Sequence, residues 1–171
     1  MLKFFQILVH MQVSENTLKW VMRLYPPLLF QRIWVQKFAD QFTGVEVKIF
    51  KSFLNSNYNR SIFGGTIFSA SDPFYALLYD QILKRRGYKV RVWLKSAEIK
   101  YLKPGRSSLY FKINLTEEDI SEAENILKTA GKFVKSFPLE IYNGKGELCA
   151  TVINEVYIRN LYHGEDGDIA Y

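Results

Sequence analysis

The stretch that decides the fold is FGGTIFSASDPFYALLYD, residues 63–80. A glycine pair opens an apolar run typical of a buried helix, yet Asp72 and Pro73 interrupt its first half. A proline inside a helix removes a hydrogen bond at a cost of about 3 kcal/mol. A carboxylate among apolar neighbours is unfavourable unless it has a partner. The sequence allows two interpretations: one kinked helix beginning at the glycine pair, or a turn followed by a helix that Asp72 caps.

The composition predicts one globular domain spanning residues 1–171. The chain is 48% hydrophobic and 16% aromatic, which is enough to bury a large core and indicates no disorder. The net charge is +6, and nine basic residues but only one acid, Glu98, lie between Lys84 and Arg106. Such a run suggests a phosphate-bearing partner, although solvated strand and helix faces are the more common explanation.

The single cysteine, Cys149, excludes an internal disulfide and lies in an apolar run, so we expect a buried thiol in a reducing compartment. No segment reaches the roughly 18 to 20 apolar residues of a membrane span. The first residues are apolar but contain no convincing cleavage site for a signal peptide. The sequence predicts a cytoplasmic protein with an apolar helical arm at 1–30 and an acidic tail at 160–171.

Hydrophobic periodicity predicts an α+β domain built on an antiparallel sheet. A first helix runs from Ser14 to Pro26, and the alternation of the second strand places Phe53 on the inner face. The third strand changes phase near Lys95, which predicts a bulge, and Pro138 predicts an edge strand or a bulge. The expected strands are 32–39, 44–53, 88–102, 107–115, 132–142 and 148–158, with helices from the glycine pair to Arg86 and over 116–130. Thr116 and Asp119 make a capping-box-like start for the second of these helices.

Two further motifs strengthen the signal of the opening stretch: KPGR at 103–106, between two strands, and the closing VYIRN at 156–160. Together with FGGTIFSASDPFY they resemble the acyl-CoA thioesterases of the phenylacetate-degradation (PaaI-like) type, over roughly residues 40–159. In that family a curved antiparallel sheet wraps around one long helix, the hotdog fold. The family pattern is approximately His-Gly-Gly followed after seven residues by Asp, and Gly64 to Asp72 keeps this spacing.

The resemblance implies a catalytic site shared between two subunits. By it, the amide of Gly64 polarises the thioester carbonyl, and Asp72 of the other subunit acts as general base or nucleophile. Phe63, Gly65 and Thr66 would lie beside the substrate, and the partner would be a second copy of the chain, as a homodimer or a dimer of dimers. The sequence departs from the family at Phe63, which replaces the His before the glycine pair.

The resemblance also places an Asn near the attacking water. Asn57 falls at that place, although a plain turn residue is at least as good an interpretation and Asn59 competes for the role. Lys103 and Arg106 would meet the phosphates of coenzyme A, which enters as part of the substrate and not as a cofactor. No metal-ligand spacing appears, and the two histidines lie near opposite ends of the chain.

The leading hypothesis is therefore an acyl-CoA thioesterase that releases free acid and coenzyme A. The alternative is a non-catalytic hotdog module that binds acyl groups or serves as a dimerisation scaffold, which the missing His favours. Nucleic-acid binding would depend on basic charge alone and is the remote third hypothesis.

Overall fold

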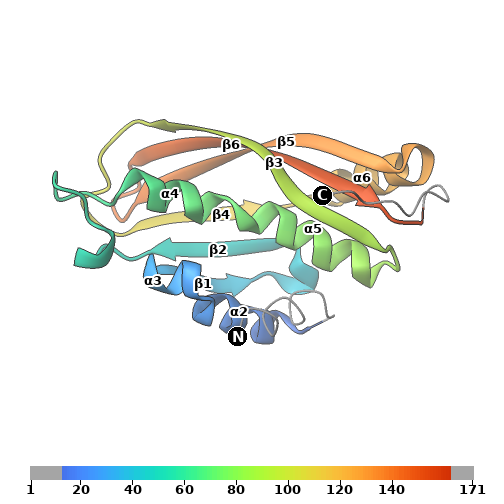
Figure 1. The fold of residues 1–171 in the computed structure, drawn as a ribbon, viewed down its shortest axis with the longest axis horizontal. Coiled ribbons are helices and arrows are strands. Elements are labelled where there is room, and N and C mark those ends of the chain that lie inside the picture. Colours follow the sequence, from blue (N-terminus) through green and yellow to red (C-terminus); the bar gives the residue numbers. More distant parts are fainter. Residues whose placement is uncertain (1–12, 163–171) are drawn as a thin grey trace.

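The computed structural model describes residues 13–162. Its sheet has six antiparallel strands in the order β1-β2-β4-β5-β6-β3, and it curves around the long helical segment α4–α5 (Figure 1). This arrangement confirms the predicted hotdog fold. The strands are β1 (Ile33–Phe38), β2 (Gly44–Ile49), β3 (Val90–Tyr101), β4 (Leu109–Asn114), β5 (Lys132–Asn143) and β6 (Leu148–Asn160).

The helix inside the sheet consists of α4 (Gly64–Ser71) and α5 (Pro73–Arg85). Asp72 joins them with helical backbone angles, φ −64° and ψ −57°, and its side chain makes no capping hydrogen bond. The helical segment therefore begins at the glycine pair, as the first interpretation predicts, and kinks at Asp72, before Pro73. The second interpretation is correct that Asp72 is the N-cap residue of a helix with Pro73 in its first position, but it is wrong that the glycine pair forms only a turn.

The core lies between this helix and the concave face of the sheet. Phe74, Leu78 and Tyr79 of α5 are fully buried against inward-facing side chains of the strands. Tyr75 stacks on Phe137 of β5 with ring centroids 4.9 Å apart. The predicted core position of Cys149 is confirmed, because its side chain is buried.

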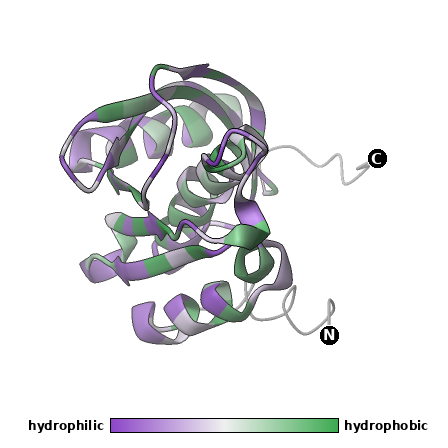
Figure 2. Cartoon of the chain, turned by 90° about the vertical axis from the view of Figure 1, so that its left-hand side faces the viewer, coloured by the Kyte–Doolittle hydropathy of each residue, from purple (hydrophilic) through white to green (hydrophobic). Residues whose placement is uncertain are grey.

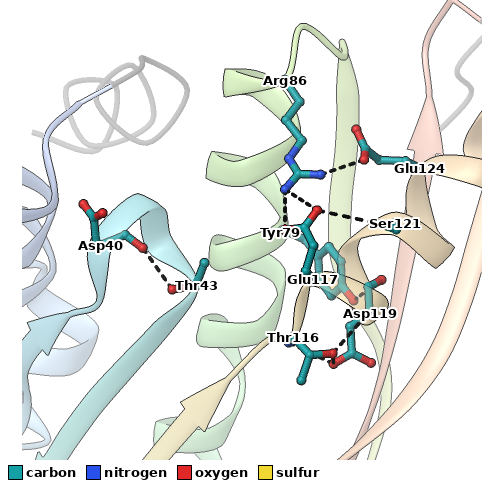
Figure 3. A network of polar contacts seen from close by, with 9 residues as sticks. All are labelled: Asp40, Thr43, Tyr79, Arg86, Thr116, Glu117, Asp119, Ser121 and Glu124. Atoms are coloured by element: carbon teal, nitrogen blue, oxygen red, sulfur yellow. Dashed lines mark hydrogen bonds and ion pairs between the residues drawn. The ribbon is translucent and has the colours of Figure 1, made fainter.

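Helix α6 (Glu117–Ala130) covers one end of the domain and is fastened to α5 by polar contacts (Figure 3). Arg86 pairs with Glu117 and Glu124, each at 2.7 Å. Thr116 and Asp119 form the predicted capping box, and the hydroxyl of Tyr79 donates to the Asp119 carbonyl. These contacts fix the end of α5 that lies far from the glycine pair.

The bulge predicted in β3 is confirmed, because the pairing of β3 with β6 shifts register between Leu94 and Ser96. The N-terminal arm contains α2 (Glu15–Leu24), capped by Ser14, and a second short helix, α3 (Pro26–Phe30). Residues 1–12 of the expected arm and 163–171 of the expected tail lie outside the described residues.

One predicted core residue is wrong. Phe53 does not continue β2 but lies in a short 3-10 helix, η2 (Phe53–Asn55), where it is exposed to solvent. A capping box between Ser52 and Asn55 starts this helix and ends the alternation of the strand. A similar turn, η1 (Asp40–Phe42), connects β1 to β2.

The sheet is split between β4 and β5. Only Leu109 and Tyr110 of β4 pair with β5, opposite Asn143 and Tyr142. Pro138 of β5 has no amide hydrogen for a neighbouring strand, and its carbonyl accepts a 2.7 Å hydrogen bond from the hydroxyl of Tyr75. A cavity of about 560 Å³ opens along this split, lined by both strands and by Gln36 and Glu46. Both predictions from Pro138 are wrong, because β5 is an inner strand of the sheet and its pairing with β6 runs without a shift through Pro138, opposite Ile153. The locally unpaired side of β5 toward β4 accommodates Pro138 instead.

Candidate active site

The first turn of α4 presents free backbone amides. Phe63 is the N-cap residue, and its carbonyl accepts from the amide of Thr66 at 3.0 Å. Within residues 13–162 the amides of Gly64 and Gly65 have no hydrogen-bond partner. A helix N-terminus with free N–H groups favours negative charge, such as the oxyanion that forms when a thioester is attacked. Gly64 therefore lies where its predicted role requires, next to a buried Thr66.

Tyr101, at the end of β3, contacts this turn directly. Its hydroxyl donates to the Gly64 carbonyl at 2.9 Å. A Cβ atom on Gly64 would lie 3.0 Å from Cζ of Tyr101, so glycine permits this close approach. Sequence reasoning did not assign Tyr101 to the site. The available signal was its position in the strand that leads into the KPGR motif.

Phe63, which replaces the family His, is exposed at the helix start. Its ring lies against Gly65, where any Cβ atom would collide with it. Gly65 is therefore needed for the placement of Phe63, and the ring adds an apolar surface beside the free amides. An apolar surface at this position favours contact with an acyl chain over contact with a charged group.

The KPGR turn packs against the same helix start. The amide of Ile62 donates to the carbonyl of Gly105 at 2.9 Å, which ties residues 103–106 to the chain just before Phe63. Arg106 is exposed and has no ion-pair partner in the described part of the chain. Lys103 is also exposed, but its ammonium group pairs with Glu147 at 2.9 Å. The fold thus brings the KPGR turn beside the chain just before the glycine pair, and of its two predicted phosphate ligands Arg106 is the one whose charge is unshared in the described residues.

The side chain of Asn57 stabilises the turn in which it lies. Its Oδ1 accepts hydrogen bonds from the amides of Asn59 and Ser61 and from the hydroxyl of Ser61. The turn interpretation of Asn57 therefore agrees with its contacts, which occupy the oxygen that would orient a water molecule. Asn59 is exposed in the same turn.

A different asparagine, Asn55, anchors the loop to the site. Its buried side chain donates to the carbonyls of Gln31 and Phe50, and its own carbonyl accepts from the amide of Phe63 at 2.8 Å. Asn55 therefore fixes the residue that caps α4. No local sequence pattern indicates this role, because the contacts join three segments that are separated along the chain.

The Asp72 carboxylate makes no hydrogen bond or ion pair with any residue among 13–162. It reaches the surface of the single chain, yet the surrounding protein removes part of its hydration. This desolvation raises the pKa of Asp72 above the usual range of aspartate. A carboxylate that is partly desolvated and unpaired is typical of a functional site.

Gly64 and Asp72 of one chain do not form one site together. Asp72 is eight positions after Gly64, which corresponds to roughly 12 Å along the helix axis. The cavity between β4 and β5 includes neither residue. A site that uses both groups on one substrate therefore needs Asp72 from a second chain.

The kink that carries Asp72 is held from the sheet. Asn154 of β6 is fully buried, and its side-chain amide donates to the carbonyl of Ser71 at 3.0 Å. The Oδ1 atom of Asn154 has no partner among the described residues. A buried polar atom without a partner is unfavourable, so the hydrogen bond from Asn154 that holds the kink comes with a cost in folding stability. Sequence reasoning read it only as part of a central strand.

Residues 14–158 match a protein family described as a domain of unknown function (DUF4442). The chain belongs to this family. No curated protein matches the DUF4442 domain described here.

Several solved structures share the fold of this DUF4442 domain. A Pseudomonas aeruginosa protein of unknown function, called a probable thioesterase, has a TM-score of 0.77 at 15% identity and covers 88% of this chain and 99% of its own. A thioesterase from Haemophilus influenzae has a TM-score of 0.65 at 13% identity, covering 91% and 97%. The E. coli PaaI protein from the phenylacetic acid degradation operon has a TM-score of 0.54 at 15% identity, covering 84% and 95%.

These likenesses agree with the fold read from the sequence. The hotdog fold is shared with the Haemophilus influenzae protein named as a thioesterase and with the E. coli PaaI protein. At such low identity these likenesses show the fold alone, and the chemistry depends on the residues of the DUF4442 domain itself.

Proposed function

We propose that this DUF4442 domain is a thioester hydrolase that cleaves acyl-CoA to a free acid and coenzyme A. The observation that carries the proposal is the unpaired, partly desolvated Asp72 at a helix kink. The free amides of Gly64 and Gly65 at the other end of α4 supply the complementary group, a donor pair for an oxyanion.

In the proposed reaction Asp72 acts as general base. It takes a proton from water while the water oxygen bonds to the thioester carbonyl carbon. The negative charge that develops on the carbonyl oxygen accepts a hydrogen bond from the Gly64 amide. When the intermediate collapses, the C–S bond breaks, and the departing thiolate receives the proton that Asp72 holds.

The proposal requires a homodimer. β3 is a long edge strand, and much of it is exposed. Unpaired strand edges favour pairing with another chain. An antiparallel β3–β3 contact would bring a second chain to the face that carries Tyr101 and the start of α4, which supports a site made from Gly64 of one subunit and Asp72 of the other.

Arg106 is the proposed primary contact for a CoA phosphate, because an arginine can hold a phosphate through two N–H bonds. Lys103 contributes less, since Glu147 shares its charge. Phe63 and Thr66 would line the acyl group. The buried thiol of Cys149 suits a reducing compartment such as the cytoplasm, which is part of the proposal.

The second candidate function is a non-catalytic module that binds acyl-CoA. Phe63 favours it, because the residue provides an apolar contact where the resembling enzymes carry a His. A panel of acyl-CoA substrates with a free-thiol readout separates the two. Release of CoA by the wild type and its loss in Asp72→Asn supports the hydrolase. Binding of acyl-CoA without release supports the module.

A subunit-mixing experiment tests the shared site. Asp72→Asn and Gly64→Pro chains are each expected to be inactive alone, and unfolding and refolding them together makes mixed dimers. Each mixed dimer has one intact site, so an equal mixture should recover about a quarter of the wild-type activity. No recovery, with dimers present by light scattering, would contradict the shared site.

A further inference from the structure

Large apolar side chains gather around Asn55 and project into solvent. Phe53 is 88% exposed and Tyr58 is 94% exposed, and Phe30 at the end of α3 is 69% exposed. Asn55 ties these segments together, because its side chain bonds to the carbonyl of Gln31, the neighbour of Phe30, and η2 ends at Asn55 itself. We call Phe30, Phe53, Leu54, Tyr58, Arg32 and Arg60 the apolar–basic end. Figure 2 views the molecule from this end.

The exposure is built into the backbone. The capping box of Ser52 and Asn55 holds η2, so Phe53 is directed outward although core space would be its usual environment. Asn57 fixes the following turn through three hydrogen bonds, which holds Tyr58 near the tip. A rigid cluster of exposed apolar side chains marks a surface that binds something apolar.

The charge around these side chains has one sign. The chain has no Asp or Glu between Leu24 and Ala39 or between Ile49 and Ser71. Arg32 and Arg60 are exposed in these segments, and neither has an ion-pair partner within residues 13–162. The KPGR turn adds Arg106 next to the same loop, through the bond between Ile62 and Gly105.

We propose that the apolar–basic end binds the surface of a bilayer that contains anionic phospholipids. Such a surface offers phosphate groups to the arginines and an apolar layer, roughly 5 to 10 Å deep, to protruding aromatic rings. The apolar–basic end contains projecting side chains and no Asp or Glu, so it complements a negatively charged layer. No helix in the described residues is long and apolar enough to cross a membrane.

The inference does not depend on thioester hydrolysis. It depends on Phe53, Tyr58 and the two arginines, none of which belongs to the proposed catalytic groups. Membrane contact and activity can therefore fail separately.

The test is flotation of the full chain with vesicles of phosphatidylcholine alone or with about 30% phosphatidylglycerol. Wild type is expected to float with the anionic vesicles and not with the neutral ones, and to be released by high salt. Phe53→Ser combined with Tyr58→Ser should reduce the bound fraction at least about tenfold. Arg32→Gln and Arg60→Gln should each reduce binding about fivefold.

Controls come from the opposite end of the domain. Tyr162 is 73% exposed, and the residue next to it bonds to Lys89 beyond the end of α5, so Tyr162→Ser should float like wild type. Lys128→Gln on α6 controls for net charge. Wild type that stays unbound, or an aromatic double variant that floats like wild type, overturns the proposal. A smaller particle mass of that variant in light scattering also overturns it, because a second copy would then cover this end.

Discussion

The side-chain amide of Asn154 donates a 3.0 Å hydrogen bond to the carbonyl of Ser71, the residue before Asp72. A buried strand thereby fixes the direction in which the helix kinks. The contact links the sheet to the proposed catalytic carboxylate although Asn154 itself touches no substrate. Its effect on activity would be one of positioning.

Replacement of Asn154 by Ala should lower the free energy of unfolding by about 1 to 3 kcal/mol, because the Ser71 carbonyl loses its donor. If the bond also positions Asp72, kcat should fall while KM changes little. Thermal unfolding and acyl-CoA kinetics measure the two effects. Asn160→Ala is a matched control on the same strand, since Asn160 donates to the Leu127 carbonyl of α6. It should cost stability and leave kcat unchanged, and a similar kcat loss in both variants would contradict the positioning role.

Asp72→Asn should lower turnover by roughly 10²- to 10⁴-fold, the usual effect of removing a positioned base. It should also raise the melting temperature at neutral pH. Burial raises the pKa of Asp72 in the folded chain above its value in the unfolded chain, so ionisation of this carboxylate opposes folding. The difference between variant and wild type should shrink as pH falls through the raised pKa.

The stability difference should be absent below about pH 3.9, where the unfolded-state carboxylate is also protonated. Calorimetry from acid to neutral pH measures it. Glu118→Gln, on the exposed first turn of α6, is the control and should leave turnover unchanged. Wild-type turnover in Asp72→Asn would refute the catalytic assignment.

Gly64→Pro tests the oxyanion donor. Proline suits the first position of a helix, so the fold should persist, while the amide hydrogen is lost. Turnover should fall roughly 10²- to 10³-fold. Gly64→Ala keeps the amide and only displaces Tyr101, so its loss should be smaller.

Gly144→Ala is the control for the substitutions of Gly64, because its Cβ atom would contact only Tyr110, at an ordinary 3.8 Å. It should behave as wild type. Equal losses for the Pro and Ala variants of Gly64 would show that space, and not the amide, is what glycine provides there.

Arg106→Ala should weaken acyl-CoA binding about tenfold, through loss of a charge-assisted contact to phosphate. Lys103→Ala should have a smaller effect, because Glu147 already holds that ammonium group. Glu147→Gln frees Lys103 and should tighten binding. Calorimetry measures all three, and the effects should shrink in high salt. An acyl-pantetheine without the nucleotide should not distinguish the variants, and if it does, the contact is not with the phosphates.

Sequence patterns correctly predicted features that depend on residues close together in the chain. The alternation of the strands, the Thr116 capping box and the phase change at Lys95 all led to correct elements. The same rule failed at Phe53, because Ser52 and Asn55 offered side-chain hydrogen bonds that end the strand pattern.

Contacts between distant segments could not be predicted in this way. Tyr101 lies 37 residues from Gly64, and Asn154 lies 83 residues from Ser71. Both contacts depend on how β3 and β6 pack against the helix, which no local sequence pattern indicates. The role of Asp72 was implied by the family resemblance, but its lack of a partner is a property of the packed chain.

The split beside Pro138 divides the sheet into two parts that few backbone pairs join. One part is β1-β2-β4 and the other is β5-β6-β3, and two residue pairs near the hairpin of Asn143 hold them together at one end. Farther along, the Pro138 carbonyl of β5 accepts its hydrogen bond from Tyr75 of α5 and not from β4. Separation of the two parts along this seam would therefore break few backbone hydrogen bonds between strands, and the sheet resists widening least at this place.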